Sequence, residues 1–180
     1  MGKRLFLFYM KHSSESGTDD VGNKGKRFIY SELNQIGPDC IIVEGGCSVC
    51  CKEFFDKWQL MEAQTTRKKA VNNLFAKSWA NENSIAFELA DLESSEAKKI
   101  FSDNIGNVFD DEIICNQQIF PPREKTISEV VKKHFDNGKK TIALFVGAKH
   151  GDNMKILLDN VAEIITKEDP ALGAEYTSSN

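Results

Sequence analysis

Apolar residues gather in four short runs along the chain, and longer amphipathic stretches separate most of them. The runs are "RLFLFYM" (4–10), "DCIIVEG" (39–45), "SIAFELA" (84–90) and "TIALFVGA" (141–148). Short, nearly continuous apolar runs are typical of strands buried on both faces of a parallel sheet. The second and fourth runs are nearly free of charge, so we expect them to be central strands.

Elsewhere apolar residues recur with the spacing of an amphipathic helix. Such patterns cover residues 52–63, 67–80, 126–138 and about 153–165. The third opens with a capping box from Thr126 to Glu129 and stops at Gly138. The apolar face of the last consists of Leu157, Val161 and Ile164.

Strands that alternate with helices predict an α/β fold with a mainly parallel central sheet and helices on both faces, in three layers. With 180 residues and no repeat, the chain is expected to form a single compact domain over residues 1–168. Residues 13–26 are polar and glycine-rich and predict a loop after the first strand. Residues 169–180 are expected to be a mobile tail.

Composition narrows the classes of function. The formal net charge of -4 gives no reason to expect nucleic acid or an anionic membrane as a partner. The apolar run from Leu5 to Met10 is too short for a signal peptide or a membrane span. Five cysteines, three of them in "CSVCC", do not suggest a disulfide framework. We therefore expect a cytoplasmic protein with reduced thiols.

Three of the predicted strands end in groups that bind metals or move protons: His12, Glu44 and His150. In open parallel sheets, ligands bind beyond the carboxyl ends of the strands, so these three side chains are expected to share one site. A single histidine or glutamate there is more often a solvated surface group. The prediction therefore depends on all three side chains lying close together. Gly147 permits close approach near His150.

A metal-binding histidine normally donates its second ring N–H to a carboxylate or a carbonyl. Asp91 and Asp152 are our candidates for that supporting role. The third histidine, His134, falls on the apolar face of a predicted helix, which favours a structural role.

Several segments resemble the TraB/Tiki superfamily, whose members include Tiki metallopeptidases, ChaN-like haem-binding proteins and erythromycin-esterase-like proteins. They are "FYMKHSSES…IYSELNQIGPDCIIVEGG", "WANENSIAFELAD" (79–91) and "REKTISEVVKKHFDNGKKTIALFVGAKHGDNMKILLDN" (123–160). The last contains a G-x-x-H motif that ends at His150. The first motif reads "YMKH", with Tyr9 where the family has its first glycine.

The resemblance implies a metal-dependent hydrolase of peptide or ester type, acting on a small-molecule or peptide substrate. His12, Glu44 and His150 would hold a divalent Mn, Co or Zn ion, Glu44 would serve as ligand or general base, and Arg123 would stabilise the developing oxyanion. Asp91 would support the site. The alternative within the same superfamily is a module that binds haem or iron without catalysis.

A different class of function remains open because Cys47 and Cys50 form a Cys-x-x-Cys motif between a predicted strand and a predicted helix. This is the context of a thiol–disulfide redox motif. Against it, no proline stands where the thioredoxin fold places its cis-proline strand. Zinc binding by this cluster would need a fourth ligand.

Overall fold

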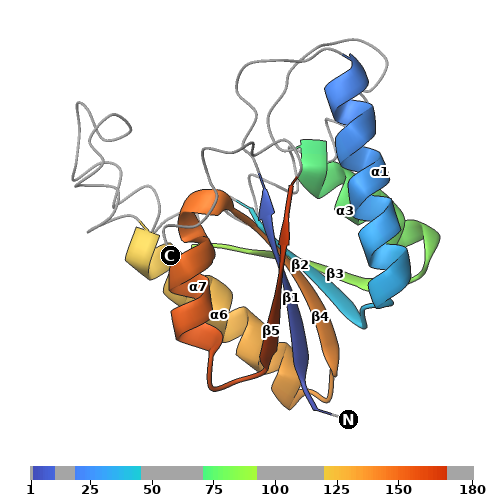
Figure 1. Ribbon diagram of the computed structural model, residues 1–180. Coiled ribbons are helices and arrows are strands. Elements are labelled where there is room, and N and C mark those ends of the chain that lie inside the picture. Colours follow the sequence, from blue (N-terminus) through green and yellow to red (C-terminus); the bar gives the residue numbers. More distant parts are fainter. Residues whose placement is uncertain (1, 11–18, 46–70, 93–119, 170–180) are drawn as a thin grey trace, which may run out of the picture.

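The computed structural model describes residues 2–10, 19–45, 71–92 and 120–169. They form one five-stranded sheet in which every strand pair is parallel (Figure 1). The strands are β1 (Arg4–Met10), β2 (Cys40–Glu44), β3 (Ala86–Ala90), β4 (Thr141–Gly147) and β5 (Glu163–Glu168), in the order β3-β2-β4-β1-β5. The predicted α/β class with a parallel sheet is confirmed.

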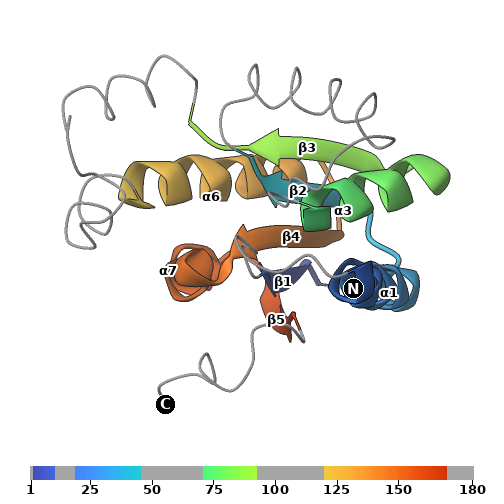
Figure 2. The same cartoon turned by 90° about the horizontal axis from the view of Figure 1, so that it is seen from above.

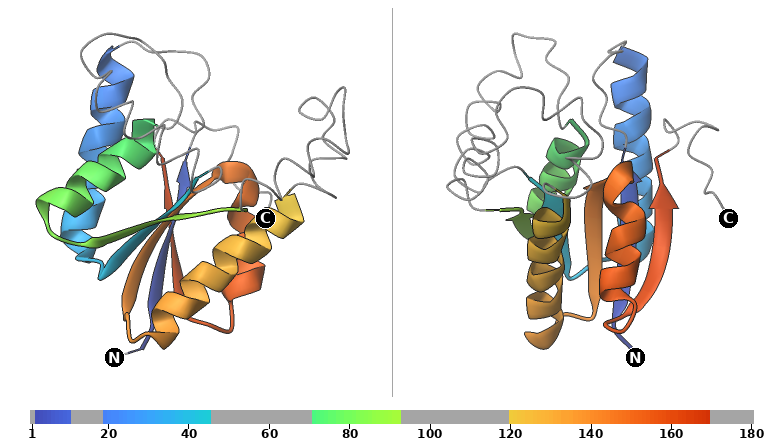
Figure 3. Two further views of the ribbon diagram at one scale, coloured as in Figure 1. Left: turned by 180° about the vertical axis from the view of Figure 1, so that it is seen from behind. Right: turned by 90° about the vertical axis from the view of Figure 1, so that its left-hand side faces the viewer.

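The helices lie in two layers, one on each face of the sheet (Figure 2). They are α1 (Asp19–Ile36) and α3 (Val71–Glu82) on one face, and α6 (Phe120–Asp136) and α7 (Gly151–Leu158) on the other. Figure 3 shows the same arrangement from behind and from the side. Within the described residues, none of the helices has the length and apolar character of a bilayer-spanning segment.

The alternation of β1 side chains divides the core into two halves. Leu5 and Leu7 belong to the cluster under α6 and α7, whereas Phe6 and Phe8 belong to the cluster under α1 and α3. Every residue of β2 and β4 is buried, and both strands have a neighbour on each side. The expectation of two central strands is confirmed, and β1 is a third interior strand.

The chain after His150 differs from the expected long helix. α7 ends at Leu158, and residues 163–168 form the edge strand β5 beside β1. Gly151, Met154 and Leu158 are the buried residues on α7, while Leu157 is 38 % exposed. Ile164 therefore packs on the core from a strand and not from a helix. Because β5 has a neighbour on one side only, its residues are half-buried at most.

Two helix starts also differ from expectation. α1 begins at Asp19, inside the predicted loop of residues 13–26. α6 begins at Phe120, with Pro121 and Pro122 in a first turn that needs no N–H donor from them. Thr126 is therefore not a cap: its hydroxyl donates to the Pro122 carbonyl within the helix, at 3.0 Å.

Candidate functional site

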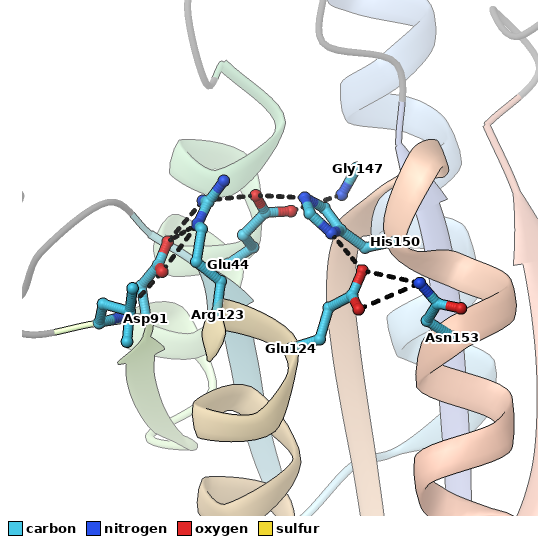
Figure 4. A network of polar contacts seen from close by, with 8 residues as sticks. Glu44, Asp91, Arg123, Glu124, Gly147, His150 and Asn153 are labelled. Carbon is cyan, nitrogen blue, oxygen red and sulfur yellow. Dashed lines mark hydrogen bonds and ion pairs between the residues drawn. The ribbon is translucent and has the colours of Figure 1, made fainter. Parts of the chain in front are cut away.

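Five polar side chains meet at the carboxyl edge of the sheet (Figure 4). Glu44 ends β2, Asp91 follows β3, and His150 closes the 3-10 turn Ala148–His150 that follows β4. Arg123 and Glu124 come from the first two turns of α6, which begins at this edge. The early start of α6 is what brings these last two residues to the strand ends.

Glu44 lies at the centre of the site and is only 8 % exposed. Its Oε1 accepts a hydrogen bond from Arg123 Nη2 at 2.8 Å, and its Oε2 accepts one from the Gly147 backbone N–H at 2.7 Å. His150 Nε2 lies 3.3 Å from the same Oε1. The structure thus brings Glu44 and His150 together, as predicted, and Gly147 supports the carboxylate through its backbone.

Asp91 holds Arg123 and not a histidine. Arg123 Nε donates to Asp91 Oδ1 at 2.9 Å and Nη2 donates to Oδ2 at 2.6 Å, so the guanidinium grips the carboxylate with two nitrogens. Burial by itself would lower the pKa of Arg123, but the contacts with Asp91 and Glu44 outweigh it and raise that pKa. Arg123 is therefore a permanent positive charge that links two strand ends.

Glu124 takes the supporting position at His150 for which Asp91 and Asp152 were the candidates. Its Oε1 lies 2.8 Å from His150 Nδ1, and the Asn153 side-chain amide donates to both of its oxygens, at 3.3 and 3.1 Å. Asp152 instead has a side chain that is 89 % exposed and lies 3.5 Å from Lys155. The prediction for Asp152 is wrong at His150, because the first turn of α7 directs that side chain outward.

Negative charge exceeds positive charge among the described groups of this cluster. Three carboxylates, those of Glu44, Asp91 and Glu124, face one guanidinium. Burial by itself would lower the pKa of His150, but the contacts with Glu44 and Glu124 outweigh it, so the pKa is raised above its ordinary value. A protonated His150 supplies part of the missing positive charge.

This raised pKa predicts a pH dependence of stability. Because the folded-state pKa lies above the unfolded value of 6.5, the protonated ring stabilises the fold fully below that pH. The contribution is lost as the pH rises through the folded pKa. We expect the free energy of unfolding of the wild type, measured by urea denaturation, to fall relative to that of His150→Gln over this window. A constant difference between the two proteins across the window would contradict the prediction.

The ring of Tyr9 fixes the start of α7 next to His150. Gly151 follows His150 directly, and a Cβ at Gly151 would overlap the Cε1 and Cζ atoms of Tyr9. Lys155 Nζ lies over the same ring, 5.1 Å from its centroid. Tyr9, which departs from the family motif, thus packs beneath the turn that carries His150.

Other predicted residues lie outside the site or outside the described part of the chain. His12, Cys47 and Cys50 are not among the described residues. His134 has the structural position expected of it, with its Nε2 2.6 Å from Glu88 Oε2. Cys40 is a buried free thiol, and burial is the main cause that raises its pKa to about 11.

The geometry of Glu44 and His150 is compatible with a shared metal ion. Two ligands of one tetrahedral ion, with bonds near 2 Å, lie about 3.3 Å apart, as His150 Nε2 and Glu44 Oε1 do. The carboxylate at Nδ1 and the excess of negative charge fit a cation as well. Among the described residues, however, no group of three or more His, Cys, Asp and Glu side chains is arranged to hold an ion. The third ligand that the sequence predicts, His12, lies outside the described residues.

Glu124 was not predicted from the sequence. The signal that could have identified it is its place beside Arg123 in "PPRE", since two prolines mark a helix start and so place both side chains at the strand ends.

Comparisons of the chain with family models, with curated proteins and with solved structures gave no match. The resemblance to the TraB/Tiki superfamily therefore stays a prediction from the motifs.

Proposed function

We propose that the protein is a hydrolase of esters or amides, with an acid–base centre made of Glu44 and His150. The observation that carries the proposal is the buried Glu44 carboxylate, held from two sides and 3.3 Å from an imidazole nitrogen. A carboxylate and an imidazole in contact at the carboxyl edge of a parallel sheet are suited to general acid–base catalysis.

Glu44 would act as the general base. Arg123 and the Gly147 N–H each bind one of its oxygens, so the carboxylate has one fixed orientation. A base held in this way can take a proton from water without a loss of conformational entropy at that step. His150, with its raised pKa, would carry the proton that the leaving group needs.

Arg123 would stabilise the negative charge that develops on the substrate oxygen. Its Nε and Nη2 are used by Asp91 and Glu44, whereas Nη1 makes no hydrogen bond to the other residues described. The side chain is 21 % exposed, so part of this charged group can face a substrate. Because two carboxylates hold the guanidinium, it would need little reorganisation during the reaction.

A divalent metal ion is part of this proposal, by resemblance to the TraB/Tiki superfamily. With an ion bound, His12, Glu44 and His150 would hold Mn, Co or Zn, His150 as a neutral imidazole and Glu44 as a ligand in place of its role as base. Such an ion lowers the pKa of a bound water.

The test is hydrolysis of a panel of p-nitrophenyl esters and short peptide amides, with Mn, Co or Zn added and with a chelator. We expect the wild type to hydrolyse one class, and Glu44→Gln to reduce the rate by about 100-fold because it removes the base. The matched control is Glu129→Gln, since the Glu129 side chain on α6 is 61 % exposed and pairs with Lys125 at the surface.

Absence of hydrolysis by the folded wild type in every condition would refute the proposal. Should the protein then bind haem or iron in a way that depends on Glu44 and not on Glu129, the binding alternative is correct.

A further inference from the structure

The imidazole of His150 lies between two buried carboxylates, one at each ring nitrogen. Glu124 Oε1 is 2.8 Å from Nδ1, and Glu44 Oε1 is 3.3 Å from Nε2. A neutral imidazole carries only one N–H, so it can donate to only one of these carboxylates. The other nitrogen presents its lone pair. The position of the proton therefore decides whether His150 presents an N–H group or a lone pair to Glu44.

Three observations favour Glu124 as the acceptor of that proton. Its contact with the ring is the shorter of the two. Glu44 Oε1 already accepts a hydrogen bond from Arg123, whereas Glu124 shares its oxygens with the neutral amide of Asn153. Asn153 donates to both Glu124 oxygens and so fixes the carboxylate plane.

The ring itself has little freedom to turn over. His150 is 3 % exposed, and the Phe120 ring packs against it edge to face, with centroids 4.5 Å apart and an interplanar angle of 72°. Phe120 and Glu124 lie one turn apart on α6, so a single helix supplies both the packing surface and the acceptor. The position of α6 therefore sets the orientation of the imidazole.

We infer that Glu124 is the positioning residue of this site: it holds the Nδ1 proton of His150 and leaves Nε2 as the nitrogen that exchanges a proton, or binds a cation, beside Glu44. The inference rests on the proposed function only in taking Glu44 and His150 as the centre. If the contact between Glu124 and His150 were purely structural, it would hold α6 against α7, and the tautomer of the ring would not depend on it.

The experiment is long-range 1H–15N NMR of the protein labelled in its three histidines, at a pH where the ring is neutral and without added metal. His150→Gln identifies the signals of His150. We expect the Nδ1–H tautomer in the wild type. In Glu124→Ala its population relative to Nε2–H should fall about tenfold, as expected for loss of a hydrogen bond to a charged group. Glu124→Asp should restore part of it, and Glu129→Ala should leave the spectrum unchanged.

An unchanged tautomer in a folded Glu124→Ala protein overturns the inference, as does a wild-type ring protonated on Nε2. If Glu124→Ala does not fold, Asn153→Ala is measured in its place. Loss of the amide frees the carboxylate to move, so the Nδ1 proton should exchange with water several-fold faster, and an unchanged exchange rate overturns the inference. No substrate is needed, so failure of hydrolysis and failure of positioning are separate results.

Discussion

Arg123→Met is expected to lower the free energy of unfolding by about 3–5 kcal/mol, the usual cost of breaking a buried ion pair by removing one partner. Arg123 bridges Asp91 and Glu44, whose side chains are 2 % and 7 % exposed. Methionine keeps most of the volume of the side chain but leaves both carboxylates without the guanidinium. The loss is measured by urea denaturation.

The matched control is Lys125→Met. Lys125 lies two residues further along α6 with a side chain that is 75 % exposed, and its ion pair with Glu129 spans 4.0 Å at the surface. Surface pairs of this kind contribute about 0–1 kcal/mol, so this variant should be nearly as stable as the wild type. Equal losses in the two variants would mean that the helix, and not the buried ion pair, accounts for the effect.

The sequence was informative where burial is complete on both sides. The apolar runs predicted β1, β2 and β4 to within one residue at each end, because interior strands of a parallel sheet must be apolar throughout. β3 is an edge strand, and it was predicted to within two residues because Glu88 is the only charged residue in its run. β5, the other edge strand, was missed because polar residues interrupt it: Glu163, Thr166 and Glu168 are exposed, so "EIITKE" has no continuous apolar run. Its two isoleucines suit a helical face as well as a strand.

The site was predictable in part for the same reason. Glu44 ends β2 and His150 closes the turn after β4, and parallel strands deliver the residues at their ends to one edge. Arg123 came from the resemblance to the TraB/Tiki superfamily. Glu124 lies on a helix whose start was placed six residues too late, so nothing brought it to the strand ends. Asp152 shows the converse, since closeness to His150 in sequence did not bring its side chain to the ring.

Gly151 shows how the packing outside the polar cluster determines the position of His150. Its backbone is that of an ordinary helix, with φ -58° and ψ -48°, so the conformation by itself does not require glycine. A Cβ would overlap the ring of Tyr9. We expect Gly151→Ala to lower the free energy of unfolding by about 3 kcal/mol, the upper end for overpacking, because either the ring or the start of α7 must shift.

A double-mutant cycle with Tyr9→Leu separates this overlap from the helix propensity of the new residue. Leucine removes Cε1 and Cζ, the two ring atoms nearest to the Cβ, so Gly151→Ala should then be neutral or stabilising by up to about 1 kcal/mol, the preference of a helix for alanine over glycine. The coupling is measured by denaturation of the four proteins, and the His150 NMR signals should move in Gly151→Ala and return toward wild type in the double mutant. An equal cost of Gly151→Ala in both backgrounds would mean that the Tyr9 ring does not set the position of this turn, and the placement of His150 would then depend on the contacts with Glu44 and Glu124 alone.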